Sequence, residues 1–421
     1  MIEYMNYVIK SLQSNNDYEH LTLSSRSLLN FKIPNAFKFQ LSNKSTPYTY
    51  NTIDISTNKV INGSITYLYT DAKGLDKLIK DSHNINIQSI VETYNHHCKT
   101  LNINKQNVDF KSLYYGRMYY PNSHLEGMII KKFTTNTQVV LKWVSSFNSC
   151  NIITGYFQKY GKRNFQELIV SSNDFLCGYR FLHNFIEQPS KLNNSLYNNS
   201  YISLGGEFWL AISTLSPTCA TTLRYCTHSA TTGRPLTLTL SFNPLFGHLS
   251  STYSAKTSSN SAFCVQYDFN LYSIDSNLSL GCELWKQNEL IQNVSQEKSK
   301  KQEIQVPPNF YNNNSNDAKQ KRILNDLNTT FESSLKKIDK ERAVIENFET
   351  DLYNKDFTSV WKFSTSLRDK NLCILWDGKF KGFLLSAGTE LIRINTNNEN
   401  NSQSLVKFYP AKLGLQLQFS T

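Results

Sequence analysis

The sequence predicts an all-β protein, built as one closed barrel of roughly 18 to 20 strands that crosses a membrane. Three observations lead to this prediction. Apolar and polar residues alternate in segments of about ten residues, the length of a tilted strand that spans a bilayer. No apolar run approaches the roughly 20 residues of a membrane helix, and a closed barrel is the other structure that satisfies every backbone polar group in lipid. Aromatic residues, 13% of the chain, gather near the segment ends, as they do at membrane interfaces.

Residues 1–45 are expected to form an N-terminal segment ahead of the barrel. Ile2, Met5, Ile9 and Leu12 recur at spacings of three and four, which predicts a short amphipathic helix within the first thirteen residues. This stretch contains Glu3, has no Arg and lacks a long apolar core. We therefore expect neither a secretory signal nor an Arg-rich transit peptide.

The strand pattern is clearest in residues 235–243, "PLTLTLSFN". Leucines and a phenylalanine occupy one face of this segment, and threonines, a serine and an asparagine occupy the other. The same alternation returns in "VINGSITYLY", "YISLGGEFWLAIS", "FCVQYDFNLYS" and "GFLLSAGTELI". Turn-forming pieces such as "SPT", "TTGRP" and "NPLFG" separate these segments. In a membrane barrel of this size, the polar face should line a wet lumen and the apolar face should contact lipid.

Residues 286–356 interrupt the strand pattern and are expected to form a long loop inserted into one barrel that covers residues 1–421. The insertion begins with a polar stretch, after which apolar residues recur at helical spacing from about Asp317 to Tyr353. An amphipathic helix over 317–353 can lie on the barrel or plug it, or it can bind a partner. The sequence leaves both alternatives open, and it does not indicate on which side of the membrane the loop lies.

The chemistry of the chain favours binding, pore formation or assembly over catalysis. The net charge of +11 suggests anionic partners such as phospholipid headgroups, but no compact Lys/Arg cluster points to nucleic acid. The eight cysteines show no CxxC spacing, and His96–Cys98 lacks a second pair of metal ligands. Because the usual hydrolase, protease and nucleotide-binding motifs are also absent, we expect no enzyme, cofactor or metal site.

Several long phrases of the chain resemble a known family. They include "SRSLLNFKIP", "INGSITYLYTDA", "KSLYYGRMYYP", "FLCGYRFLHNF", "TLRYCTHSATTGRPLTLTLSFNPLFGHLSSTYSAKT" and "TSVWKFSTSLRDK". These phrases are similar to the fungal mitochondrial distribution and morphology protein 10 family, from the first residues to the closing "FST". The resemblance implies a mitochondrial outer-membrane barrel of nineteen strands, related in architecture to the voltage-dependent anion channel and the general import channel.

The resemblance also implies two sets of partners. One is the endoplasmic reticulum–mitochondria encounter structure, a tether and phospholipid-transfer complex that includes mitochondrial distribution and morphology proteins 12 and 34 and maintenance of mitochondrial morphology protein 1. The other is the sorting and assembly machinery, with its core barrel and peripheral subunits, which promotes biogenesis of the import channel. Membrane phospholipids complete the expected partners, and the expected location is the outer membrane at contact sites.

The resemblance further implies a targeting signal in the last strand, "KLGLQLQFST". A polar residue, a Gly two positions later, and large hydrophobic residues three and five beyond that correspond to Lys412, Gly414, Leu417 and Phe419. A Gly at this place allows a neighbouring backbone to approach closely, while the alternation decides which face meets lipid. The strand edge can then be recognised by strand addition during insertion.

Two aromatic pairs are candidate partner contacts, Tyr67 with Tyr69 and Tyr267 with Phe269. Each pair would lie on the lipid side of its strand, where it can pack against a partner or serve in the aromatic girdle. The alternative function is a metabolite or anion channel, because charged residues are also expected to face the lumen. These residues are Lys142, Glu207, Arg224, Asp268, Glu283 and Glu390.

Overall fold

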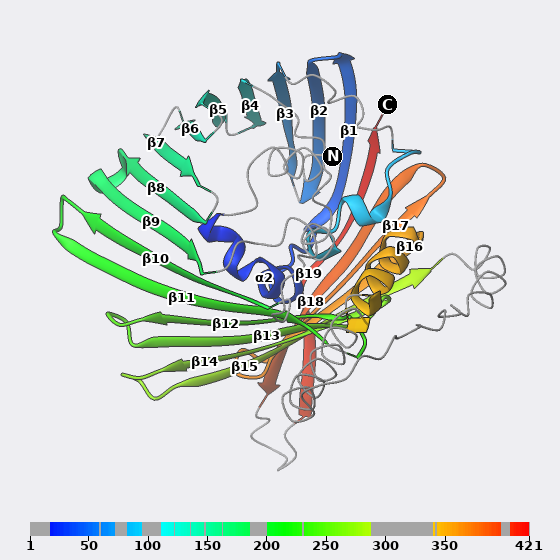
Figure 1. The fold of residues 1–421 in the computed structure, drawn as a ribbon. Helices are drawn as coiled ribbons and strands as arrows, with labels where there is room; N and C mark the ends of the chain where they lie inside the picture. Colours follow the sequence, from blue (N-terminus) through cyan, green and yellow to red (C-terminus); the bar gives the residue numbers. More distant parts are fainter. Residues whose placement is uncertain are drawn as a thin grey trace, which may run out of the picture.

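The computed structural model describes residues 17–58, 60–71, 82–94, 111–121, 123–134, 136–146, 149–161, 163–185, 200–229, 231–287, 340–341, 343–396 and 405–420. The helix predicted within residues 1–13 and the site considered at His96–Cys98 lie outside these residues. A short helical turn η1 (Tyr18–Thr22) and helix α2 (Leu23–Leu29) precede the first strand, and η3 (Ile87–Ser89) and η4 (Asn173–Phe175) lie between strands (Figure 1).

Nineteen strands make up the rest of the fold. Their bounds are β1 (Ala36–Thr46), β2 (Thr49–Asn58), β3 (Val60–Thr70), β4 (Ser112–Tyr120), β5 (Leu125–Thr134), β6 (Thr137–Ser146), β7 (Ser149–Tyr160), β8 (Asn164–Ser171), β9 (Leu176–Asn184), β10 (Tyr201–Ala211), β11 (Ser216–His228), β12 (Pro235–Asn243), β13 (His248–Ser258), β14 (Ser261–Asn270), β15 (Ser276–Gln287), β16 (Phe357–Ser366), β17 (Asn371–Phe380), β18 (Phe383–Thr396) and β19 (Leu405–Ser420).

The strands form one closed barrel, which confirms the predicted fold class. Each strand pairs antiparallel with the next along the chain, and the ring closes where β1 meets β19. Because the number of strands is odd, the first and last strands run in the same direction, and their pairing is parallel. The closing register places Ala36 opposite Gly414 and Ser42 opposite Ser420.

The two faces of the barrel are inverted relative to a water-soluble β protein. On β2, Thr52 is 0% exposed and Asp54 is buried, whereas the intervening Ile53 is 46% exposed. The leucines of β12 likewise face outward and its threonines are buried. The interior is therefore lined with polar side chains, and the outer surface is apolar. Within the described ranges, no helix combines the length and apolar character needed to cross a membrane.

The two mouths of the barrel differ in their connections. The long-loop mouth carries the connections β3–β4, β9–β10 and β15–β16 and the end of β19. The short-turn mouth carries the turns β8–β9, β10–β11, β12–β13, β14–β15 and β16–β17 and the start of β1. In Figure 1, the turns that join β10 to β11, β12 to β13 and β14 to β15 lie at the left.

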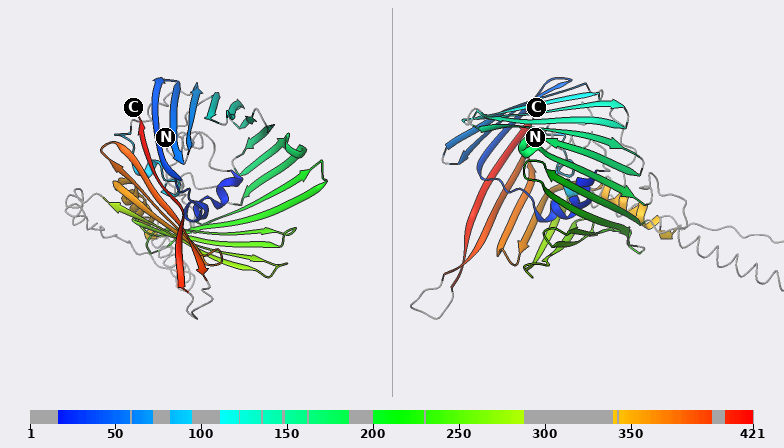
Figure 2. Two further views of the ribbon diagram at one scale, coloured as in Figure 1. Left: turned by 180° about the vertical axis from the view of Figure 1, so that it is seen from behind. Right: turned by 90° about the vertical axis from the view of Figure 1, so that its left-hand side faces the viewer.

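The described part of the N-terminal segment, residues 17–35, lies inside the ring of strands (Figures 1 and 2). Helix α2 places Leu28 and Leu29 against Ala262 and Cys264 on the inner face of β14. Its seven residues are too few for an isolated helix to be stable, so this packing supplies most of its stability.

Two further segments pack inside the long-loop mouth. Ile87, Val91 and Tyr94 form one apolar cluster with Leu352 and with Trp285 of β15 and Phe357 and Val360 of β16. Leu352 belongs to a helix whose described residues are 340, 341 and 343–354. The remainder of the helix predicted over 317–353 lies outside the described residues.

Candidate functional site: the closing strand and the polar interior

Gly414 lies where the backbone before β1 crosses the last strand. A Cβ atom at this position would overlap the carbonyl group of Pro34 and lie 2.7 Å from the carbonyl oxygen of Ala36. Any other residue would push the two backbones apart at the parallel β1–β19 pairing. Glycine is thus required here by a close backbone approach, at the point where the barrel closes.

The other residues of the predicted targeting signal occupy both faces of β19. Lys412 pairs with Glu390 of β18, with Nζ 2.7 Å from a carboxylate oxygen. Gln416 and Gln418 are buried on the inner face, so Leu417 and Phe419 belong to the outer face. Leu417 lies opposite Phe39 of β1, and the ring of Phe419 packs 5.1 Å from that of Phe383.

A segment from the β3–β4 connection holds the end of β19. The backbone amide and the hydroxyl of Ser82 both donate to the carbonyl oxygen of Ser420, each at 3.1 Å. The ring of His83 meets that of Phe419 edge-on at 6.5 Å. Further along, Lys379 of β17 donates to the carbonyl oxygens of His83 and Ile85. The final strand is therefore fixed by residues more than 300 positions away in sequence.

The two candidate aromatic pairs lie at opposite mouths of the barrel. Tyr67 and Tyr69 face outward near the end of β3, at the long-loop mouth, and the Tyr69 ring lies 6.0 Å from that of Tyr114. Tyr267, also exposed, and Phe269 lie near the end of β14, at the short-turn mouth. The structure places the pairs on different sectors of the wall, so one partner cannot cover both without reaching across the barrel.

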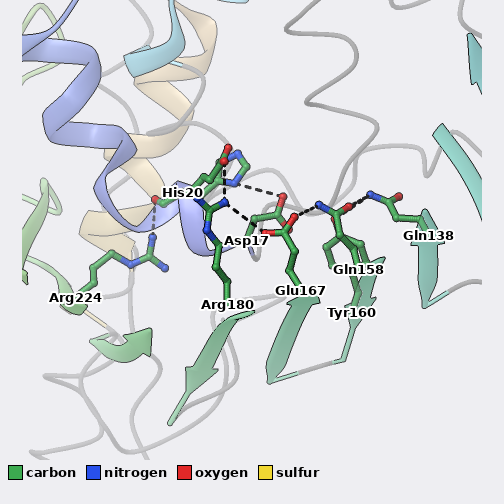
Figure 3. Close-up of polar contacts among 9 residues, drawn as sticks. Asp17, His20, Gln138, Gln158, Tyr160, Glu167, Arg180 and Arg224 are labelled. Carbon is green, nitrogen blue, oxygen red and sulfur yellow. Dashed lines mark hydrogen bonds and ion pairs between the residues drawn. The ribbon is translucent and has the colours of Figure 1, made fainter. Parts of the chain in front are cut away.

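A polar clamp holds the N-terminal segment inside the lumen (Figure 3). Arg180 on β9 is its centre, because Glu167 of β8 and Glu207 of β10 lie directly opposite it in register. Its guanidinium lies 3.5 Å from a Glu167 oxygen and 3.3 Å from a Glu207 oxygen, and 3.1 Å from Glu19 of η1. Arg180 therefore links three neighbouring strands to the segment that they enclose.

Uncharged groups extend the clamp on both sides. Gln138 donates to Gln158, and Gln158 donates to Glu167 at 2.7 Å. On the other side, Arg224 of β11 donates to the carbonyl oxygen of His20 at 3.1 Å, which is drawn in Figure 3. Asp17, at the start of the described segment, lies 3.7 Å from the His20 ring. Burial, followed by the nearby carboxylate of Glu167, raises the pKa of Asp17 well above its ordinary value.

Helix α2 is seated by a second glycine and a buried ion pair. A Cβ atom at Gly281 of β15 would lie 2.7 Å from the carbonyl oxygen of Leu28 and 3.0 Å from a methyl group of Leu29. Lys362 of β16 pairs with Glu283 at 3.3 Å and donates to the carbonyl oxygen of Ser27 at 3.5 Å. The wall of the barrel is thus shaped to receive the helix.

All six charged residues predicted in the lumen face inward, and each has a partner. Arg180, Lys362 and Lys412 pair with Glu207, Glu283 and Glu390, and Asp268 accepts a hydrogen bond from Gln266 at 2.9 Å. Lys142 lies over the ring of Tyr156, and Arg224 binds the N-terminal segment. These charges therefore hold the interior together.

Comparison with known proteins places the chain in a family. The family model described as "Mitochondrial distribution and morphology protein 10" matches residues 1–421. The chain belongs to this family. Proteins of that name are 51% identical in Zygosaccharomyces rouxii, 47% identical in Saccharomyces cerevisiae strain S288c and 47% identical in Kluyveromyces lactis, with each chain covered over its full length. Membership supports a role in mitochondrial distribution and morphology, and the family name denotes no reaction.

For this member of the mitochondrial distribution and morphology protein 10 family, sequence reasoning missed most of the clamp. Glu207 and Arg224 were predicted to face the lumen, but Asp17, Glu167 and Arg180 were not singled out. Alternation along β8 and β9 puts Glu167 and Arg180 on inner faces, which is a signal that the sequence carries. Their pairing depends on the strand register, which the sequence alone did not provide.

Proposed function

We propose that the protein is a non-catalytic β-barrel of the mitochondrial outer membrane that anchors partner complexes. One complex is the endoplasmic reticulum–mitochondria tether, in which the barrel fixes proteins of the phospholipid-transfer assembly to the membrane. The other is the sorting and assembly machinery, where the barrel promotes the biogenesis of the import channel. The family membership reported above supports this proposal, which follows the partners that the resemblance implies.

The main support for the membrane part of the proposal is that the outer face of the barrel is apolar and the inner face is polar. Outward residues such as Ile65, Leu238 and Tyr253 are 40–63% exposed, whereas the polar residues on either side of each are buried. In water, such an outer surface would favour aggregation, because soluble monomers rarely expose such large apolar patches. In lipid, the same surface is solvated.

Alkali extraction of isolated mitochondria tests the membrane part. We expect the protein to remain in the membrane pellet, because a closed barrel leaves the bilayer only when the bilayer is dissolved. A peripheral protein of the same organelle provides the extraction control. Release of this protein into the supernatant would contradict the proposal.

The separation of the aromatic pairs supports two partner surfaces. Changing Tyr67 and Tyr69 together to Ala should weaken one partner complex, and changing Tyr267 and Phe269 together to Ala should weaken the other. A matched control is available on β9, where the rings of Tyr179 and Phe181 also face outward at i and i+2 and stack at 6.4 Å.

Native electrophoresis of solubilised mitochondria shows the amounts of both complexes in one experiment. We expect each double variant to lose one complex while the Tyr179 and Phe181 double variant keeps both. If all three variants retain both complexes, the candidate pairs are not partner contacts. If all three lose both, the aromatic side chains act through barrel stability.

The occupied lumen distinguishes the anchor from the channel alternative. Residues 17–29 and 82–94 lie within the barrel, where they contact four inward-facing charges. These are Arg180, Arg224, Lys362 and Lys379. We therefore expect the full-length protein in a planar bilayer to show at most a small conductance. A large, reproducible anion-selective conductance would favour the channel.

A further inference from the structure

The turns at the short-turn mouth carry large apolar side chains at their tips. We call this set the apolar rim and define it as Phe175, Leu215, Phe246, Tyr272, Ile274 and Leu367. Their side chains are 58% exposed at Leu367 to 77% exposed at Ile274. They come from five successive turns, β8–β9 through β16–β17, which adjoin around the mouth because their strands are hydrogen-bonded neighbours.

Hydrogen bonds and an ion pair join these turns in two groups. The hydroxyl of Tyr272 donates to the carbonyl oxygen of Pro244 at 2.8 Å, which ties the β14–β15 turn to the β12–β13 turn. Ser213 donates to the carbonyl oxygen of Asp174 at 3.1 Å, and Arg368 pairs with Asp275 at 3.0 Å. The β8–β9 turn is thus bonded to the β10–β11 turn, and the β12–β13, β14–β15 and β16–β17 turns form a second bonded group.

Three rim residues adopt an unusual backbone conformation. Phe175, Leu215 and Ile274 have φ angles of +47°, +50° and +58°, in the left-handed region where turns normally place Gly, Asn or Asp. The β12–β13 turn has the ordinary residue, Gly247, at the corresponding place. Lys370 has the same conformation in the β16–β17 turn (φ +52°), so this geometry repeats at the short-turn mouth, and in three of the five turns a large apolar side chain occupies the position.

The length of the outer apolar stripe indicates that the rim contacts lipid. On β12, the stripe from Leu236 to Phe242 covers six residue steps, which at about 3.4 Å each and a tilt of about 40° give a height of about 16 Å. The apolar band of a membrane barrel is about 25 Å tall. Leu245 and Phe246, both exposed, extend the apolar surface beyond the strand into the turn.

The opposite mouth is polar between β11 and β14. The β11–β12 turn there contains Ser229, Thr231, Thr232 and Arg234, and the β13–β14 turn contains Ser259 and Asn260. Between β11 and β14, the apolar outer surface is thus displaced toward the short-turn mouth. We propose that the bilayer covers the apolar rim, so that these turns, rather than the strand ends, lie at the boundary between hydrocarbon and headgroups. This inference rests on the membrane placement proposed above.

Thiol accessibility tests the inference on the full-length protein. Leu215→Cys and Ile274→Cys report on two separate turns of the rim. Thr232→Cys, exposed at the other mouth, is the reference for a thiol in water. Leu240→Cys, outward in the middle of β12, is the reference for a thiol in lipid. A sulfonated maleimide is admitted to both sides of phosphatidylcholine vesicles by freeze–thaw, and peptide mass spectrometry separates each introduced thiol from the native cysteines.

We expect both rim thiols to react at least ten-fold more slowly than the Thr232→Cys thiol. A charged reagent does not enter hydrocarbon, and an apolar environment also suppresses the reactive thiolate. Reaction of either rim thiol as fast as Thr232→Cys, with Leu240→Cys slow, would overturn the rim inference and leave the membrane placement intact. Fast reaction at Leu240→Cys as well would overturn the membrane placement itself.

The same variants in isolated mitochondria separate lipid from protein as the covering partner. Slow reaction in both vesicles and mitochondria supports lipid. Fast reaction in vesicles combined with protection in mitochondria would show that a protein covers the rim, and would overturn the proposal. Two variants on different turns guard against the failure of one to assemble.

Discussion

Replacing Arg180 by leucine removes the cation at the centre of the polar clamp and leaves a shorter, apolar side chain that faces inward. Glu167, whose side chain is 5% exposed, and Glu207 would then face each other across β9 without a counter-ion. At an effective dielectric constant of about 20, a charge pair at about 4 Å interacts by about 4 kcal/mol. Removing one partner of a buried pair typically costs about 3–5 kcal/mol, because an uncompensated charge stays behind.

The expected result is a local loosening of the N-terminal segment. A loss of about 3 kcal/mol in local stability increases the open population about 150-fold. Hydrogen exchange of the peptide that contains residues 17–29, measured by mass spectrometry on the full-length protein in phospholipid vesicles, reads this population. Peptides from β14 and β15 report in the same experiment whether the barrel itself remains closed.

Two further variants make the measurement decisive. Glu167→Gln and Glu207→Gln added to Arg180→Leu remove the stranded charges and should restore more than half of the lost protection. Arg368→Leu breaks an ion pair whose side chains are about half exposed, and should leave the exchange of residues 17–29 unchanged. Unchanged exchange of residues 17–29 in Arg180→Leu would refute the reasoning that the clamp holds the segment.

Three other perturbations follow from the same geometry. Gly414→Ala combined with Leu417→Ala should slow membrane assembly of newly made protein by several-fold in an import assay. The control Gly116→Ala, which has open space around its Cβ, should assemble normally. Equal assembly rates for the double variant and the control would contradict the proposed targeting signal. Gly281→Val should displace α2 and destabilise its packing by about 1–3 kcal/mol, seen as faster exchange of residues 23–29 but not of β4. Because the folded-state pKa of Asp17 is raised, its contribution to local stability is greatest below its unfolded pKa of about 3.9 and is lost as pH rises through the folded value. Asp17→Asn should flatten that part of the pH dependence of exchange and strengthen protection at pH 7, and an unchanged pH profile would contradict this assignment.

The sequence determined the strands and their two faces. Alternation with a period of two assigned Leu238 and Leu240 to one face and Thr237 and Thr239 to the other, and the structure confirms this division. Alternation is a local property, so it requires no knowledge of which strands are neighbours. The absence of long apolar helical runs then left a closed barrel as the way to bury the backbone in lipid.

The sequence predicted the candidate sites around Gly414 and Arg180 only in part. Gly414 drew attention through the family resemblance, and the tertiary structure supplied the reason, which is the carbonyl group of Pro34 in the backbone just before β1, at the other end of the chain. The clamp around Arg180 depends on register, since a shift of one residue would turn Glu167 outward. Register is set by the turns and by the closure of the whole ring, and neither is encoded within one strand.

The packing of the segments inside the barrel was decided by tertiary structure. Residues 17–29 and 82–94 show weak local signals, because their order comes from packing against β13–β17 and from hydrogen bonds to carbonyl groups that are distant in sequence. The apolar rim has the same origin, since five turns that are scattered over nearly 200 residues of sequence become one surface only when their strands are neighbours. The sequence thus determined what each strand presents to lipid and to the lumen, and the closed ring decided which of those groups meet.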